Sequence, residues 1–263
     1  MALDVLVTGG AGFIGSRIAA SLIADGHRVV VADDLSTGYR ENVPAEATFV
    51  PSDLSREEGI AVLPDRPYGA ILHLAGQSSG EKSFDDPARD FDANARSTLL
   101  LADWALQREI PALLHASSMG VYGNAGVAPV AEDAPTRPLS WYGASKLAAE
   151  RVLEAAAAQG LRTVSFRMFN VYGRGQDLEN MKQGMVSIYL AYLLRGEPVL
   201  VKGALDRVRD FVHVDDVVEA WRLALEKPLS GPFNLGTGVG TTVGDLLAGL
   251  FEAIGVGAGA VVA

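Results

Sequence analysis

The chain has 263 residues, of which 49% are hydrophobic, so it is long and apolar enough to bury a core and is not typical of a disordered protein. Its formal net charge of −10 opposes binding to nucleic acid and to anionic membranes, which attract basic surfaces. It contains no cysteine, which excludes disulfides, thiolate nucleophiles and cysteine-ligated metals.

The N-terminal segment and the apolar runs bear on the location of the protein. An acidic Asp4 stands where a signal peptide has basic residues, and an apolar strand begins at once. No apolar run reaches the length of a membrane span. We therefore expect a cytoplasmic protein that holds any bound phosphate with backbone amides and a few placed Arg or Lys side chains.

Apolar, β-branched runs alternate with amphipathic stretches through the first half of the chain. Strand, helix and strand are predicted in turn at 4–8, 13–24 and 28–32. Further strands are predicted at 47–50, 70–74, 112–116 and 161–166, and helices at 88–107 and 140–158. This alternation predicts an α/β fold with a doubly wound parallel sheet, a Rossmann fold, in which ligands bind outside the carboxyl ends of the strands.

The second half has a different texture, with glycine-rich loops after about Asn170. Helices are predicted at 181–194, 214–225 and 243–251, and a short strand at 199–201. We expect a smaller, more irregular lobe from this part of the chain.

A glycine-rich turn follows the first predicted strand and opens the first predicted helix, where residues 8–15 read Thr-Gly-Gly-Ala-Gly-Phe-Ile-Gly. Gly9 would permit a tight turn, Gly12 would let backbone amides approach a pyrophosphate, and Gly15 would let helix and strand pack closely. The alternative is a plain turn with coincidental glycines. The strand, turn and helix context favours a dinucleotide site.

Two acidic residues, Asp33 and Asp34, follow the second predicted strand. A carboxylate there can accept hydrogen bonds from both hydroxyls of the adenosine ribose and would repel the additional phosphate of NADP, so the sequence favours NAD. The alternative interpretation of Asp33 is a solvated loop or turn residue.

Tyr142 and Lys146 lie four residues apart at the start of a predicted helix, so they share one helix face. A free phenol titrates near pH ~10 and acts as a base at neutrality only if cations stabilise its phenolate. Lys146 and a positive nicotinamide ring would supply that charge. By itself the pair could equally be a surface Tyr and a surface Lys.

Ser118 strengthens the catalytic interpretation because it lies at the carboxyl end of a predicted buried strand. Its hydroxyl could hydrogen-bond the oxygen of the reacting carbon. A serine there could also simply form a turn. Together Ser118, Tyr142 and Lys146 would combine hydrogen bonding, proton transfer and pKa tuning.

Seven motifs occur in the order seen in one enzyme family. They are GGAGFIG at 9–15, DDLSTG at 33–38, HLAGQ at 73–77, SSMGVYG at 117–123, YGASK at 142–146, FNVYG at 169–173 and RDFVHVDDV at 209–217. Over nearly its whole length the chain resembles the extended short-chain dehydrogenase/reductases that act as NAD-dependent nucleotide-sugar epimerases and dehydratases, in particular the UDP-glucose 4-epimerase-like members.

The resemblance implies a set of ligand-binding residues. For NAD it implies Gly9, Gly12, Phe13, Ile14, Gly15, Asp33, Asp34, Ser36, Thr37, Gly38, Asp53, Leu54, Leu74, Ala75, Gly76, Gln77, Asn94, Ala116, Tyr142 and Lys146. For a nucleotide-diphosphate sugar, with a UDP-sugar favoured, it implies Ser79, Glu81, Lys82, Ser118, Met119, Gly120, Tyr142, Asn170 and Arg209.

Each of these roles has a structural alternative. Asp53 could cap the following helix, and Asn94 could be a buried polar group of its helix. Arg209, which by resemblance clamps the diphosphate, could instead pair with Asp206 or Asp210.

The resemblance leaves the outcome of the reaction open. In an epimerase, Tyr142 as phenolate removes the proton of the sugar C4 hydroxyl while NAD accepts the C4 hydride, and the 4-keto sugar then rotates and is reduced on its other face.

The 4,6-dehydratases usually carry an Asp-Glu pair where this chain has Met119 and Gly120, which disfavours ordinary 4,6-dehydration. Glu81 or Lys82 could supply the elimination chemistry of an unusual 4,6- or 5,6-dehydratase, although a solvated charged loop is the simpler interpretation. The third alternative is a non-catalytic NAD-binding regulator.

The resemblance also bears on domains and assembly. It implies an NAD-binding domain at 1–170, to which later segments return, and a mainly substrate-binding lobe at 171–263. The family usually continues for several elements beyond Ala263, so this form is either naturally short or lacks part of the lobe. The helices at 88–107 and 140–158 often form a homodimer interface in relatives.

The histidines do not suggest a metal site. His73 and His115 follow apolar strand residues without a second ligand at a metal-binding spacing, so satisfied core histidines are expected. His213 stands beside Asp215 and Asp216 in what is typical of a helix start capped by carboxylates.

Overall fold

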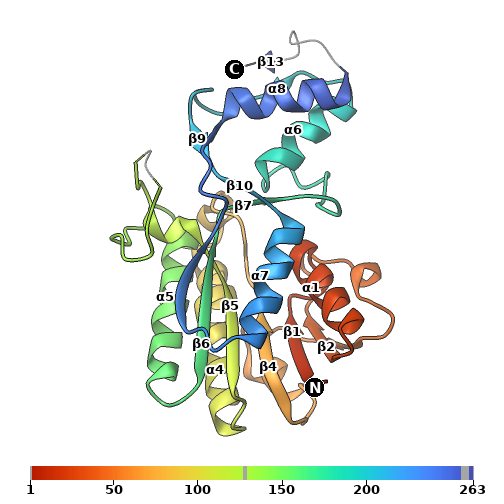
Figure 1. Ribbon diagram of the computed structural model, residues 1–263, viewed down its shortest axis with the longest axis vertical. Coiled ribbons are helices and arrows are strands. Elements are labelled where there is room, and N and C mark those ends of the chain that lie inside the picture. The colour runs from red at the N-terminus through yellow and green to blue at the C-terminus, as the bar shows by residue number, and fades with distance from the viewer. Residues whose placement is uncertain (1, 127–128, 256–260, 263) are drawn as a thin grey trace.

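The computed structural model describes residues 2–126, 129–255 and 261–262. Its main body is a seven-stranded sheet in the order β11-β6-β5-β4-β1-β2-β3 (Figure 1), in which each neighbouring pair is parallel. The strands are β1 (Asp4–Thr8), β2 (Arg28–Asp33), β3 (Thr48–Pro51), β4 (Tyr68–His73), β5 (Ala112–Ser118), β6 (Arg162–Met168) and β11 (Gly231–Leu235). The predicted doubly wound Rossmann fold is confirmed.

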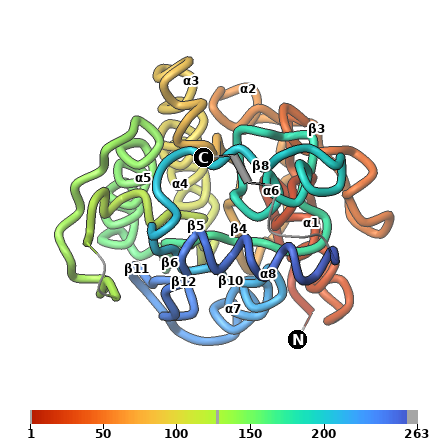
Figure 2. The backbone as a smooth tube through the Cα atoms, turned by 90° about the horizontal axis from the view of Figure 1, so that it is seen from above, coloured from red at the N-terminus to blue at the C-terminus, as the bar shows by residue number. Residues whose placement is uncertain are grey.

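Helices cover both faces of this sheet because successive strand residues point to opposite sides. In β1, Val5 and Val7 belong to one buried cluster, with residues of α1 (Phe13–Ala24) and α7 (Val214–Glu226), while Leu6 belongs to the other, with residues of α4 (Ser97–Gln107) and α5 (Trp141–Ala157). Figure 2 shows α4 and α5 on one side of the strands and α7 on the other. The short α2 (Glu57–Ala61) follows β3 and precedes β4 in the chain.

The helix predicted at 88–107 is interrupted by a turn of π-helix. It consists of α3 (Pro87–Phe91), the π-helical η3 (Asp92–Arg96) and α4 in direct succession. Such bulges insert an additional residue into the helical turn and are frequent at functional sites.

The second half of the chain returns to the Rossmann body before it ends. Trp221 of α7 is fully buried in the core, with its ring centroid 5.2 Å from that of Phe166 in β6. β11, which was not predicted, extends the sheet beside β6. Pro232 in β11 is compatible with this position because an edge strand does not need every backbone N–H.

A smaller lobe lies over the carboxyl ends of the strands (Figure 1). It contains α6 (Met185–Leu194), α8 (Val243–Ile254), β8 (Val199–Leu200), β9 (Val208–Arg209), β12 (Thr241–Thr242) and β13 (Val261–Val262). β7 (Asn170–Tyr172) pairs with β10 (Phe211–His213) where the chain passes between the two parts. Residues 256–260 and 263 of the predicted lobe lie outside the described residues. No helix of the described part has the length and apolar character to span a membrane.

The 3₁₀-helices are η1 (Arg40–Asn42), η2 (Lys82–Phe84) and η4 (Met119–Tyr122). The helix predicted from 181 begins only at Met185, because Gly184 has a positive φ of 85° and interrupts the helical backbone.

Candidate active site

A large cleft of about 1450 Å³ opens at the carboxyl edge of the sheet. The turns after β1, β2 and β4 line it, together with the first turns of α5 and the loop before α6. One cavity therefore contains the glycine turn, Asp33, Tyr142 and Lys146. It lies outside the carboxyl ends of the strands, where doubly wound sheets bind their ligands.

The glycine turn is packed so closely that two of its positions exclude a side chain. Gly9 has a φ of +67°, and a Cβ there would lie 2.5 Å from the backbone nitrogen of Ala75. A Cβ at Gly15 would collide with the carbonyl oxygen of Gly9. Gly12 is the N-cap of α1 and lines the cleft, so the free N–H groups at the start of that helix face a space suited to a phosphate.

Asp33 is buried and holds the glycine turn in place. Its carboxylate accepts hydrogen bonds from the backbone N–H of Ala11 at 3.0 Å and of Leu35 at 2.8 Å. Burial raises the pKa of Asp33, and the two backbone hydrogen bonds oppose that effect. The sequence did not indicate this structural role. Asp34 is exposed and accepts hydrogen bonds from Ser36.

Asp53 and Leu54, which the resemblance implies for NAD binding, also line the cleft. Asp53 accepts hydrogen bonds from Ser55 N–H and Oγ and pairs with Arg56 at 3.1 Å. The carboxylate thus orders the turn before α2, a local structural role close to the helix-cap alternative. Leu54 is buried in the core beside it.

The first two turns of α5 present Tyr142 and Lys146 to the cleft. The helix begins at Trp141, where the Ser140 hydroxyl accepts a hydrogen bond from the N–H of Gly143 at 3.1 Å. The Lys146 Nζ lies 6.0 Å from the centroid of the Tyr142 ring.

Burial governs the charge of both side chains. Lys146 is only 4% exposed, and burial lowers its pKa to about 8, with Asp90 opposing the shift. Because this pKa is above 7, the ammonium form still predominates at neutral pH. Burial raises the pKa of Tyr142, while the nearby Ser118 hydroxyl lowers it. The phenolate thus needs further positive charge close to the ring.

Ser118 ends β5 directly beside this pair. Its hydroxyl accepts a hydrogen bond from the N–H of Gly120 at 3.1 Å and so caps η4. A Cβ at Gly120 would lie 3.3 Å from the Ser118 Oγ and 3.7 Å from the Tyr142 Cδ1. The structure therefore brings Ser118, Tyr142 and Lys146 together, with Met119 in the same turn.

Other predicted substrate residues lie between the Rossmann body and the lobe. The Asn170 amide donates to the carbonyl of Asp210 at 2.8 Å and so fixes the junction of β7 and β10. Arg209 donates to the carbonyl of Val208, whereas the Asp210 carboxylate accepts from Thr237 and Gly238. Arg209 therefore does not depend on Asp210 for its position.

The loop that follows Gln77 contacts the lobe through several pairs. Glu81 pairs with Lys202 at 3.3 Å and lies outside the cleft lining, while Lys82 lines the cleft. The Ser79 hydroxyl donates to the carbonyl of Lys182 at 2.9 Å.

A segment to which the sequence assigned no role in the site, residues 174–183, crosses the cleft. Tyr39 donates to Asp177 at 3.1 Å on one rim, and Gln183 donates to Ser78 at 2.7 Å on the other. The Arg17 guanidinium of α1 donates to the carbonyl of Arg174. Several residues of this segment also line the cleft. Its glycines and charges gave no periodic signal by which it could be found.

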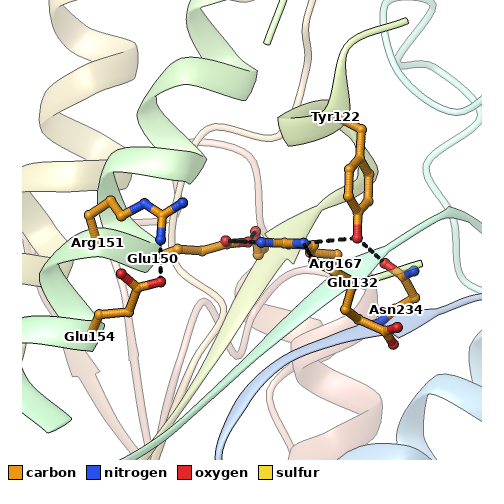
Figure 3. Close-up of polar contacts among 8 residues, drawn as sticks. Tyr122, Glu132, Glu150, Arg151, Glu154, Arg167 and Asn234 are labelled. Atoms are coloured by element: carbon orange, nitrogen blue, oxygen red, sulfur yellow. Dashed lines mark hydrogen bonds and ion pairs between the residues drawn. The ribbon is translucent and has the colours of Figure 1, made fainter. Parts of the chain in front are cut away.

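A buried polar network fixes α5 one turn after Lys146. Figure 3 shows Arg167 of β6 between Glu150 of α5 and Tyr122 of η4. The guanidinium donates to the Glu150 carboxylate at 2.8 and 3.0 Å and to the Tyr122 hydroxyl at 2.9 Å. Ser117, next to Ser118, donates to Glu150 at 2.5 Å, and Tyr122 donates to Asn234 of β11 at 2.7 Å. The network therefore ties α5 to the strand that carries Ser118.

The two core histidines differ in their partners. His73 bonds with the hydroxyls of Thr8 and Thr98, and burial lowers its pKa to about 3. Neither ring nitrogen of His115 has a partner within the described residues, and its pKa is also lowered by burial. The His213 ring accepts the N–H of Asp215 and caps α7, a capping role the sequence assigned to carboxylates. No cluster suited to a metal ion occurs among the residues described.

Known proteins resemble this chain in both sequence and architecture. The NAD dependent epimerase/dehydratase family matches residues 5–236. The chain belongs to this family. The family resemblance inferred from the seven motifs is thereby confirmed.

Three relatives illustrate the similarity. A UDP-glucose 4-epimerase of Mycolicibacterium smegmatis is 38% identical over 96% of this chain and 83% of its own length. A UDP-glucose 4-epimerase of Thermotoga maritima, solved with UDP-glucose, is 39% identical with a TM-score of 0.94 over 98% of this chain and 85% of that one. A UDP-glucose 4-epimerase of Thermus thermophilus, solved with NAD, is 42% identical with a TM-score of 0.90 over 97% of this chain and 84% of that one.

Replacing Arg167 by Met should lower the free energy of unfolding by about 3–5 kcal/mol, because it leaves the Glu150 carboxylate buried without its counter-charge. Urea denaturation measures the change. Arg151→Met is the matched control, since its pair with Glu154 is exposed and should contribute at most about 1 kcal/mol. Equal losses in the two variants would show that the buried pair does not stabilise the fold.

Proposed function

We propose that this chain is an NAD-dependent nucleotide-sugar epimerase that acts on a UDP-sugar through a transient 4-keto sugar. The observation that carries the proposal is the shared cleft, which brings Tyr142 and the Lys146 ammonium to the same cavity as the glycine turn. The UDP-glucose 4-epimerases that resemble the chain support the choice of sugar chemistry.

The residues of the cleft fit NAD. The absence of side chains at Gly9 and Gly15 lets the turn pack closely against the loop after β4 and against the start of α1, and that helix start offers N–H groups to a pyrophosphate. Asp33 presents a carboxylate at the end of β2, which suits ribose hydroxyls and disfavours an additional phosphate. Bound NAD would supply the hydride acceptor and a positive ring close to Tyr142.

Side chains of the protein then carry out and control the proton transfer. Tyr142 removes the proton from the C4 hydroxyl of the sugar as its carbon is oxidised, and returns it when the ketone is reduced. Lys146 supplies the positive charge that favours the phenolate, and Ser118 donates a hydrogen bond to the sugar oxygen. We assign the diphosphate and the sugar to Asn170, Arg209 and the lobe.

Dehydration is the alternative outcome. Lys82 lines the cleft, where it could supply the proton transfer that elimination needs. Glu81 points to Lys202 in the lobe instead, and Met119 and Gly120 offer no acid or base after Ser118. These contacts favour epimerisation.

Turnover of UDP-glucose in deuterated water separates the two reactions. Epimerisation at C4 should give UDP-galactose without carbon-bound deuterium, because the same hydride returns to the sugar. NMR of the product measures the label. A keto-deoxy product that carries deuterium would instead establish elimination and refute the epimerase assignment.

Replacing Tyr142 by Phe should reduce kcat by about 10²–10⁴-fold, since it removes the proton-transfer group, while NAD stays bound. Steady-state assays and NAD released on denaturation report the two properties. Tyr68→Phe is the control, because the Tyr68 hydroxyl is buried without a partner in the described residues, and Tyr68 begins β4, outside the cleft lining. NAD binding without any turnover in the unaltered protein would favour a non-catalytic NAD-binding regulator.

We also propose a homodimer. Large apolar side chains are exposed on η2, α3, α4 and the start of α5, namely Phe84, Phe91, Leu99 and Trp141. A second copy packing α4 and α5 against this face would cover them.

A further inference from the structure

A buried carboxylate lies against α5, the helix that carries Tyr142 and Lys146. None of the seven sequence motifs contains this carboxylate, and the proposed mechanism gives it no role. Asp90 in α3 is 1% exposed. It accepts a hydrogen bond from the Gln77 amide at 2.6 Å and another from the Ser145 hydroxyl at 2.6 Å. A carboxylate that accepts on both oxygens is bound in the manner of an ionised group.

The position of Asp90 follows from the helix that carries it. Asp90 and Asn94 are four residues apart across the junction of α3 and η3, so they share one face of the helix. Asn94 donates to the Ser145 hydroxyl at 3.0 Å, and that hydroxyl donates to Asp90. Both residues therefore hydrogen-bond the side chain of Ser145, which precedes Lys146 in α5.

Lys146 and Asp90 also balance each other in charge. A buried charge is costly unless an opposite charge compensates it. Neither side chain takes part in an ion pair within 4.0 Å among the residues described, and both line the cleft. Asn94 Oδ1 and Lys146 Nζ both approach Gly76, where a Cβ would collide with the first and lie 3.2 Å from the second. Lys146 therefore lies beside the helix turn that carries Asp90 and Asn94, and both charges line one cleft.

We propose that Asp90 is a positioning residue and the counter-charge of the catalytic pair. Through Ser145 it fixes the first turns of α5, while Gln77 holds its other carboxylate oxygen, and its negative charge keeps Lys146 in the ammonium form. This inference rests on the proposed function, because it assigns Lys146 a role in catalysis.

The charge of Asp90 acts on both catalytic groups in the same direction. It raises the pKa of Lys146 and also that of Tyr142. The neighbouring strands add no competing charge at neutral pH, since burial keeps His73 of β4 and His115 of β5 neutral. The remaining charged groups of this region line the cleft from other elements and are Lys82, Asp85, Asp86, Arg89, Asp92, Arg96 and Lys182.

Replacing Asp90 by Asn should therefore move both limbs of the pH profile of kcat to lower pH by about 1 unit. The limb set by Tyr142 moves because the phenol would ionise more easily, and the limb set by Lys146 moves because the ammonium would lose its proton at lower pH. Tyrosinate ultraviolet absorbance, taken as the difference from the same protein with Tyr142→Phe, should show the same downward shift without any turnover. Asp90→Ser removes the same charge and serves if the Asn variant does not fold.

Two control variants separate charge from position. Asp92→Asn removes a carboxylate of the partly exposed cleft rim and should leave both limbs in place. Ser145→Ala keeps the charge but removes a hydrogen bond, so kcat should fall without movement of the limbs.

A fall of kcat in Asp90→Asn or Asp90→Ser with unmoved limbs and an unchanged tyrosinate titration would overturn the proposal. If the unaltered protein turns over no nucleotide sugar but the tyrosinate shift is observed, the proposed function fails and the assignment of Asp90 as the counter-charge of this cleft stands.

Discussion

The proposed chemistry of the cleft depends on one buried ammonium group, that of Lys146. Burial makes its charge costly, and its pKa falls to about 8. The charge is nevertheless retained at neutral pH, where it can favour the phenolate of Tyr142. A solvated lysine at the same spacing would keep its proton more firmly but would be screened by water, so it would act weakly on the phenol.

Two carboxylates hold the helix that carries this charge. Asp90 contacts α5 at Ser145, next to Lys146, and Glu150 contacts β6 and β5 one turn later. Asp90 is the proposed counter-charge of Lys146, whereas Glu150 forms a buried ion pair with Arg167 in the core. Hydrogen bonds that hold the neighbours of a reacting group preserve its geometry, so both carboxylates help to keep Tyr142 and Lys146 in position.

Much of the fold follows from local pattern. Strands such as β1, β2 and β5 are buried on both faces, so their continuous apolar runs stand out. The glycine turn follows β1 as predicted, and Tyr142 and Lys146 lie at the predicted start of α5. β11 escaped prediction because its Gly and Pro weaken a strand signal, and the π-turn at 92–96 has no periodic signature. The internal hydrogen bonds of Asp33 and the partners of Asp90 and Glu150 join residues distant in sequence, which no local pattern can specify.

The protonation of Lys146 itself tests the central claim most directly. NMR of the protein labelled at its lysine side chains follows each ε-position through a pH titration, and the signal lost in Lys146→Met identifies the residue. The buried site predicts a resonance that titrates near pH 8, well below the ordinary value of 10.5. A Lys146 resonance that titrates with the exposed lysines near 10.5 would contradict the buried ammonium on which the proposed chemistry rests.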